Sequence, residues 1–109
     1  MFYYKVEVLR IVDGDTVDVR MDLGFNVWHK CRVRLLGINA PESRTRDLEE
    51  KARGLAAKDW LIEKLDDAEV EMQSHGTGKY GRVLGELFIE GVNINQLMIK
   101  EGHAVEYNG

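Results

Sequence analysis

The sequence has few of the features that cross-link a chain covalently or anchor it in a membrane. Its single cysteine, Cys31, cannot form a disulfide within the chain, which fits a reducing compartment. No apolar run approaches the ~18 residues of a membrane-spanning helix. The segment Met1–Lys5 leads into an alternating pattern, not into the basic and then apolar segments of a signal peptide. These absences predict a cytoplasmic protein.

Internal repeats, low-complexity stretches and linkers are also absent, so we expect the 109 residues to form a single domain, residues 1–109. A hydrophobic fraction of 44% and a charged fraction of 31% are typical of a folded domain and not of a disordered chain. The net charge of −4 argues against a general nucleic-acid binder. Residues 28–46, however, carry five basic side chains against one acidic one, and such local potential can attract an anion.

Short segments with alternating apolar and polar residues predict five strands. They lie at Tyr3–Val12, Val17–Asp22, Trp28–Leu36, Ala68–Met72 and Arg82–Ile89. The apolar residues of the first strand change parity near Leu9, which indicates a bulge or a switch of the buried face there. Residues 74–79 include two glycines and are expected to form a mobile loop. Trp28 and Trp60 are expected to pack in or against the core.

Two helices are predicted between and after these strands. The first runs over Leu48–Leu65, with Asp47 as N-cap and Gly54 marking close packing on the sheet. Its expected buried stripe comprises Leu48, Ala52, Leu55 and Ile62, joined by Ala56, Leu61 and Leu65. The second is capped by Asn93 and ends near Glu101, before Gly102 and a short tail that is expected to be extended.

The predicted order is three strands, a helix, two strands and a helix. A helix inserted between the third and fourth of five short strands is typical of the oligonucleotide/oligosaccharide-binding (OB) barrel. The sequence therefore predicts a mainly β fold with helices (α+β), a five-stranded OB-fold barrel of order β-β-β-α-β-β-α.

The most informative stretch runs from Arg32 to Glu42. Lys30, Arg32 and Arg34 alternate with apolar residues, so one strand face presents a row of basic side chains. Pro41, the only proline, makes the following turn a stiff mount for the Glu42 carboxylate. Arginine beside an aimed carboxylate suggests phosphate chemistry, because guanidinium groups bind phosphate oxygens in a bidentate way. An ordinary edge strand with solvated charges would show the same pattern.

Two further segments carry candidate chemistry. Asp13 and Asp15 stand two residues apart at a hairpin mouth, and oxygen ligands so close together suit a hard cation such as Ca²⁺. The same residues are also common in plain hairpin turns. The second segment, 79–82, is basic and aromatic at the start of a strand. It could contact nucleic acid, with Tyr80 stacking on a base, or be a solvated loop.

Three motifs stand in order along the chain: Val12-Asp-Gly-Asp-Thr-Val17, Arg34-Leu-Leu-Gly-Ile-Asn-Ala-Pro-Glu42 and Lys79-Tyr-Gly-Arg82. In this order and spacing they resemble the staphylococcal nuclease (thermonuclease) family. The resemblance covers almost the whole chain, and Asn95–Gly102 looks like that family's second helix. It implies the barrel described above and Ca²⁺-dependent cleavage of DNA or RNA phosphodiesters.

The resemblance also implies roles for the matching residues. Glu42 would act as general base on the attacking water, while Arg34 and Arg82 would hold the phosphate and stabilise its pentacoordinate transition state. The expected metal ligands are Asp15, Asn39 and the backbone carbonyl of Ala40, with Asp13 close by in the outer shell. Lys79 and Tyr80 would contact a neighbouring phosphate. We expect Arg44 and Arg46 to contact substrate as well.

The sequence departs from the family pattern in two places. The family commonly has an aspartate ligand where this chain has Asn39, whose amide brings no charge, so we expect weaker Ca²⁺ binding. The family also usually continues into a third helix that covers the barrel. We expect that helix to be missing here, so that either the barrel tolerates the loss or a homo-oligomer or another partner covers the gap.

Two functions remain open from the sequence. The first is a Ca²⁺-dependent nuclease that hydrolyses phosphodiester bonds of DNA and/or RNA with little sequence specificity. The second is a catalytically weakened or inactive OB-fold module that binds nucleic acid or protein. Asn39 favours the second, whereas Arg34, Glu42 and Arg82 together favour the first.

Overall fold

A computed structural model describes residues 3–78 and 81–108 of the chain. Five strands of seven or more residues build the main sheet: β1 Tyr3–Asp13, β2 Thr16–Asp22, β3 Trp28–Leu35, β5 Val70–Thr77 and β6 Val83–Ile89. Three strands of two residues are β4 Ile38–Asn39, β7 Val92–Asn93 and β8 Val105–Glu106. The helices are α1 Leu48–Leu65 and α2 Ile94–Lys100.

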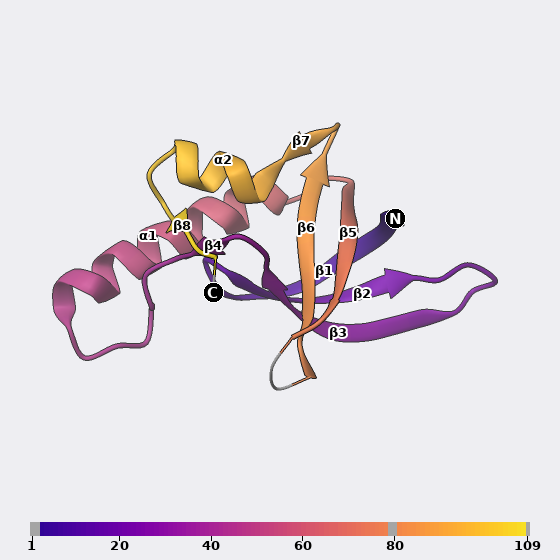
Figure 1. The fold of residues 1–109 in the computed structure, drawn as a ribbon, viewed down its shortest axis with the longest axis horizontal. Helices are drawn as coiled ribbons and strands as arrows, with labels where there is room; N and C mark the ends of the chain where they lie inside the picture. The colour runs from indigo at the N-terminus through magenta and orange to yellow at the C-terminus, as the bar shows by residue number, and fades with distance from the viewer. Residues whose placement is uncertain (1–2, 79–80, 109) are drawn as a thin grey trace.

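The five long strands form a closed barrel. The sheet order is β3-β2-β1-β5-β6, and a parallel pairing of β3 with β6 joins the two ends. The helices lie on one side of the barrel, whereas the β2–β3 hairpin projects away from its opposite end (Figure 1). Alternate side chains such as Val17, Val33 and Leu35 are fully buried inside. The expected OB-type barrel and its element order are confirmed.

The first strand contains the expected bulge. Its pairing with β2 shifts by one residue between Val8 and Arg10, so Leu9 is the extra residue. This shift lets Val6 and Ile11, which have opposite parity in the sequence, both face the core. One long strand can therefore pair with β5 near its start and with β2 along its second half.

The predicted loop at residues 74–79 is wrong over most of its length, because β5 extends to Thr77. Ser74 pairs with Gly85, and Thr77 pairs with Val83 after a register shift. Backbone pairing along the hairpin has overridden the polar, glycine-rich composition from which the loop was predicted. Lys79 lies outside the described residues.

Helix α1 begins where predicted, because the Asp47 carboxylate accepts hydrogen bonds from the N–H groups of the first turn. The predicted buried stripe is correct at Leu61 and Leu65 and wrong at its other positions. The buried positions are Gly54, Ala57, Leu61 and Leu65, whereas Leu48 is 79% exposed. The helix approaches the barrel so closely that small residues are required in the contact. The helix therefore buries the face that carries small residues, and not the face that carries most of its large apolar side chains.

Gly54 does mark a close contact, but with the loop that follows β4 and not with the sheet as predicted. A β-carbon at this position would overlap the backbone carbonyl of Glu42 and lie 2.6 Å from the Ser43 nitrogen. Helix and loop therefore touch through their backbones, and any side chain at position 54 must move one of them.

Helix α2 begins at its predicted cap, Asn93, whose side chain accepts a hydrogen bond from the Gln96 N–H. After the helix, Gly102 adopts a positive φ of 80° and turns the chain back. β8 then pairs with β4, so the tail is extended where it was expected to be. Among the described residues, no helix has the length and apolarity needed to cross a membrane. Cover of the barrel by a partner stays a prediction.

Gly54→Ala tests the contact between helix α1 and the loop, because the contact decides whether the substitution raises or lowers the free energy of unfolding. In an unconstrained helix interior, this change stabilises by about 1 kcal/mol. Here we expect destabilisation of about 1–3 kcal/mol, because the added carbon forces helix and loop apart. Urea unfolding of the variant measures the difference, with Ala56→Gly as a control for helix propensity on an exposed face. Equal or greater stability of Gly54→Ala would contradict the contact.

Candidate functional site

Asp15 lies in the hairpin between β1 and β2, and both of its carboxylate oxygens have partners. One accepts a hydrogen bond from the Thr16 hydroxyl at 3.0 Å, and the other accepts one from the Ala40 backbone N–H, also at 3.0 Å. The Asp15 carbonyl accepts a bond from the Leu35 N–H at 2.8 Å. The hairpin is thus fixed against both the end of β3 and the turn that follows β4.

Arg34 faces this carboxylate. Its Nη2 lies 3.7 Å from Asp15 Oδ2, and the side chains are only 15% and 13% exposed. Arg34 Nη1 donates to the Leu35 carbonyl at 2.9 Å, and the guanidinium carbon lies 5.8 Å from the centre of the Tyr107 ring. Shielding from water strengthens the attraction between the two charges. Because a guanidinium has five N–H donors, donors are left over for an anion.

The turn that carries Glu42 is held at both ends. Ala40 is bound to Asp15, and the Asp13 carboxylate accepts hydrogen bonds from the N–H and hydroxyl of Ser43. Ser43 is only 3% exposed, and α1 packs against its backbone. Glu42 itself is exposed. The backbone anchors on either side bring it to the side of the barrel that carries Asp15.

Arg82 precedes β6 and is half-buried. The parallel register sets Val83 beside Val33 and Leu84 beside Arg34. By strand alternation, Arg82 extends the face that carries Arg34. The two strands are tied together by fully buried Asn95, whose amide accepts from the Leu87 N–H and donates to the carbonyls of Leu36 and Gly85.

Among the described residues, no hydrogen bond or ion pair joins the side chains of Asn39, Arg44 or Arg46 to this cluster. Asn39 is exposed and borders a shallow groove that is also lined by Pro41, Arg53 and His103. Arg44 and Arg46 are exposed on the loop before α1. Lys79 and Tyr80 lie outside the described residues. The geometry therefore groups Asp13, Asp15, Arg34, Ala40 and the Glu42 turn.

The site has the oxygen donors that a hard cation prefers, but these donors carry little negative charge. Carboxylate and carbonyl oxygens are the ligands that Ca²⁺ prefers, and Asp15, Ala40 and Asn39 carry such oxygens. Within residues 3–78 and 81–108, no group of three or more His, Cys, Asp or Glu side chains is placed to hold a metal ion. Asp13 is already bound to Ser43. A cation here would rely mainly on the single charge of Asp15.

Three residues of the site region were missed from the sequence: Ser43, Asn95 and Tyr107. Ser43 directly follows the predicted Glu42, but its burial depends on a partner 30 residues away. Asn95 lies on the same helix face as buried Ile94 and Met98, which was the available signal for a buried amide. Tyr107 gave no signal, because its contact with Arg34 arises only from the return of β8 to β4.

The basic row on β3 is partly neutralised by its neighbours. Arg32 donates to Asp18 on β2 at 2.8 Å and 3.2 Å, and this hydrogen bonding lowers the pKa of the Asp18 carboxyl, against the effect of its partial burial. Arg20 makes a similar bond to Glu7 at 2.7 Å. Lys30 stands across from Arg20 in the register and, within the described part of the chain, has no ion-pair partner.

The Asp18–Arg32 pair predicts a pH dependence of stability. Because the folded pKa of Asp18 is lowered, its contribution is present above the unfolded pKa of about 3.9 and is lost as pH falls through the folded value. Asp18→Asn should remove this part of the acid dependence and leave a small destabilisation at neutral pH. Urea unfolding between neutral pH and about pH 3 measures it. An unchanged acid profile in Asp18→Asn would rule out the pair's contribution.

These features define a class of protein: an OB-type barrel with a shielded arginine–carboxylate pair beside a rigid acidic turn. The family model described as "Staphylococcal nuclease homologue" matches residues 32–109, more than half of the chain. The chain therefore belongs to the staphylococcal nuclease family.

Named relatives agree with this assignment. The chain is 34% identical over 113 residues to a protein named micrococcal nuclease from Shigella flexneri, covering 95% of this chain and 59% of that protein. It is 29% identical over 99 residues to a thermonuclease from Staphylococcus intermedius, covering 89% and 56%. An uncharacterized Bacillus anthracis protein is 36% identical over 104 residues, covering 93% and 46%. The chain thus spans about half the length of these relatives.

Proposed function

We propose that this protein is a Ca²⁺-dependent nuclease that hydrolyses phosphodiester bonds of DNA and/or RNA with little sequence specificity. The observation that carries the proposal is the convergence of Asp15, Arg34 and the Glu42 turn, joined by the 3.0 Å bond from the Ala40 N–H to the Asp15 carboxylate. Family membership and relatives named as nucleases support it.

The proposed reaction uses charge and position. Phosphoryl transfer needs neutralisation of the equatorial phosphate oxygens and a nucleophile in line with the leaving group. Arg34 and Arg82 supply positive charge from neighbouring strands. Glu42, on a turn fixed at both ends, accepts a proton from the attacking water as general base. Because both ends of the turn are bonded, little reorganisation is needed to aim the carboxylate.

Asp15, the Ala40 carbonyl and Asn39 would hold the cation, with Asp13 in the outer shell. Bound Ca²⁺ would offset the charge of the scissile phosphate and help to orient it. Asp13 would act chiefly through Ser43, by keeping the Glu42 turn in place. Lys79, Tyr80, Arg44 and Arg46 would contact more distant parts of the nucleic acid.

Glu42→Gln tests the general base. The amide preserves shape but cannot accept the proton, so we expect the cleavage rate to fall by about 10²–10⁴-fold. Digestion of plasmid and of single-stranded substrate is followed with Ca²⁺ and with chelator. The matched control is Glu49→Gln, an exposed residue in the first turn of α1 that should retain full activity.

The outcomes separate the enzyme from a binding module. Chelator-sensitive cleavage that is lost in Glu42→Gln supports the proposal. Cleavage equal in the two variants would show that Glu42 is not the base. Nucleic-acid binding without Ca²⁺-dependent cleavage would instead identify a non-catalytic OB-fold module, the reading that the single-charge metal site favours.

Asn39→Asp tests whether position 39 contributes to metal binding. An added carboxylate at a cation ligand should lower the Ca²⁺ concentration for half-maximal cleavage by about tenfold or more. Gln96→Glu, an exposed position on α2, adds the same charge outside this cluster and should leave the Ca²⁺ dependence unchanged. An unchanged Ca²⁺ dependence in Asn39→Asp would show that residue 39 is not a ligand.

A further inference from the structure

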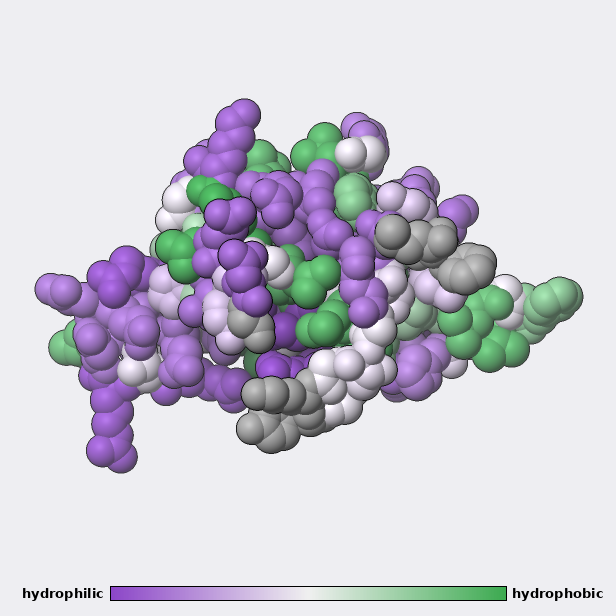
Figure 2. Space-filling view, viewed as in Figure 1, coloured by the Kyte–Doolittle hydropathy of each residue, from purple (hydrophilic) through white to green (hydrophobic). Residues whose placement is uncertain are grey.

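The tip of the β2–β3 hairpin exposes four large apolar residues to solvent. Phe25 is 102% exposed, and Val27, Leu23 and Trp28 are 52%, 45% and 42% exposed. The expectation that Trp28 packs in or against the core is therefore wrong, whereas Trp60 is half-buried against the core as expected. The tip forms a hydrophobic end to a largely polar face of the molecule (Figure 2).

The tip also holds Phe25 in an unfavourable backbone conformation. Gly24, Phe25 and Asn26 have φ values of 83°, 54° and 61°, in the left-handed region. Glycine and asparagine adopt this region readily, but a bulky side chain seldom does. Phe25 gains no burial in return. Neither turn geometry nor core packing accounts for a phenylalanine here, which makes this ring a candidate for contact with a ligand.

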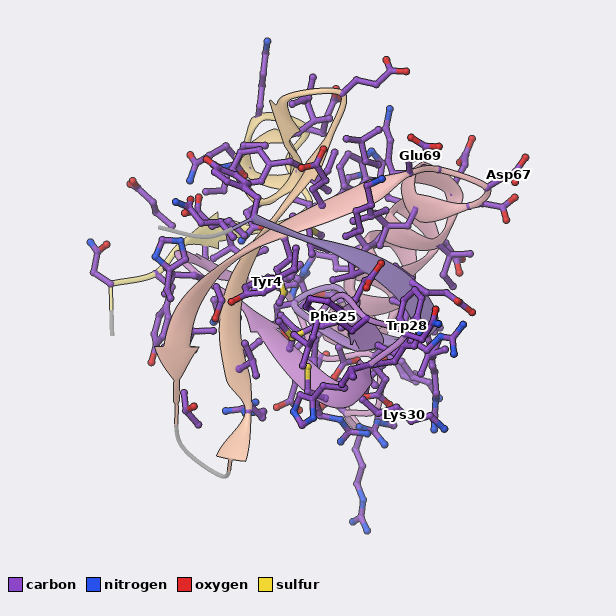
Figure 3. The ribbon with its side chains drawn as sticks, turned by 90° about the vertical axis from the view of Figure 1, so that its right-hand side faces the viewer. Tyr4, Phe25, Trp28, Lys30, Asp67 and Glu69 are labelled. Carbon is purple, nitrogen blue, oxygen red and sulfur yellow. The ribbon has the colours of Figure 1, made fainter. Side chains whose placement is uncertain are left out.

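The ring of Trp28, within the tip, is held by a neighbouring arginine. The Arg20 guanidinium lies 4.3 Å from the centre of the Trp28 ring and is itself held by Glu7. Phe25, Trp28 and Lys30 gather at this end of the hairpin (Figure 3). A supported indole beside a free phenyl ring and a lysine combines π surfaces with a cation, as in sites that stack single-stranded bases.

The tip is connected to the candidate active site along one strand. Trp28 and Arg34 stand at opposite ends of β3 on the same face, about 20 Å apart at about 3.3 Å per residue. Between them, a groove of about 310 Å³ is lined by Leu9, Arg10, Asp18, Val19, Lys30 and Cys31. Arg10 and Lys30 give this groove two cations beside one acid, a path suited to a phosphate backbone.

We infer that the hairpin tip is a stacking platform for the single-stranded nucleic acid that the proposed site would cleave, and this rests on the proposed function. The strand lies with a phosphate at Arg34, runs past Lys30 and stacks bases on Trp28 and Phe25. The platform adds affinity only for substrates long enough to reach from the site to the tip.

Two other occupants fit the observations less well. A four-residue tip is much smaller than the roughly 800 Å² per partner of a stable protein interface. An anionic membrane attracts clusters of several basic residues, but the strands next to the tip carry only Arg20 and Lys30 among their lysines and arginines near this end, and Arg20 is already paired with Glu7.

Oligonucleotide length tests the platform. Binding of fluorescent oligothymidylates of about 4 and about 12 nucleotides is measured by anisotropy in the Glu42→Gln background, with Ca²⁺ and with chelator. Combined Phe25→Ala and Trp28→Ala should weaken binding of the longer oligonucleotide by about tenfold or more and leave the shorter unchanged. The matched control is Leu48→Ala with Leu55→Ala, two exposed apolar residues of α1, which should alter neither.

Two further measurements exclude a folding defect. Phe25→Gly relieves the left-handed strain, so its thermal midpoint should equal or exceed that of the parent while binding of the longer oligonucleotide falls. In Trp60→Phe, Trp28 is the only tryptophan, and its fluorescence should be quenched by the longer oligonucleotide.

Several results would overturn the platform. They are equal loss for both lengths, no loss, or no binding by the parent chain. A blue shift of Trp28 emission on anionic vesicles, without response to oligonucleotides, would identify a membrane contact, and concentration-dependent dimerisation lost in the double variant would identify a second copy. Length-dependent binding without Ca²⁺-dependent cleavage would leave the platform standing and overturn the proposed nuclease.

Discussion

The candidate site depends on the hydrogen bond from the Ala40 N–H to the Asp15 carboxylate. It joins the β1–β2 hairpin to a turn 25 residues further along the chain. The same carboxylate accepts from Thr16 and faces Arg34, so one side chain positions the hairpin, the guanidinium and the start of the Glu42 turn. Bonds to an ionised acceptor are stronger than neutral ones. Loss of this carboxylate would therefore release three segments at once.

Small residues make this arrangement possible. A β-carbon at Gly14 would lie 2.9 Å from the Ala57 β-carbon and 3.0 Å from that of Ala40, and Gly54 meets the backbone of Glu42 and Ser43. Hairpin, turn and helix therefore come together through glycine and alanine. Such close packing holds the side of the acidic turn that faces α1, whereas Glu42 projects from the other side into solvent. Rigidity at the turn and exposure of its carboxylate are thus compatible.

Local sequence signals predicted most of the fold. Alternation located the strands and caps located both helix starts, because each depends on neighbouring residues. The order of strands and helices then indicated the barrel. Most of the buried face of α1 and the length of β5 were predicted wrongly, because tertiary contact selected Gly54 over Leu48 and pairing with Gly85 overrode polar Ser74. These choices are made by partners that the local pattern does not contain.

The sequence supplied candidate site residues but not the hydrogen bonds between them. Two short motifs, residues 12–17 and 34–42, pointed to Asp15, Arg34 and Glu42. The roles of Ser43 and Asn95 depend on partners 30 and 59 residues away. The pattern of residues within one segment cannot reveal a hydrogen bond to a partner so far away in the sequence. The structure therefore adds the connections that convert a set of residues into a rigid site.

The central charge pair has a consequence for ligand binding under the proposed function. In the free protein, Asp15 and Arg34 neutralise each other at 3.7 Å with little exposure to water. A cation bound to Asp15 weakens the neutralisation of the Arg34 charge. In the same way, a phosphate bound to Arg34 weakens the neutralisation of the Asp15 charge. An uncompensated, shielded charge costs free energy. Binding both ligands together avoids that cost, so each must raise the affinity for the other by the same factor.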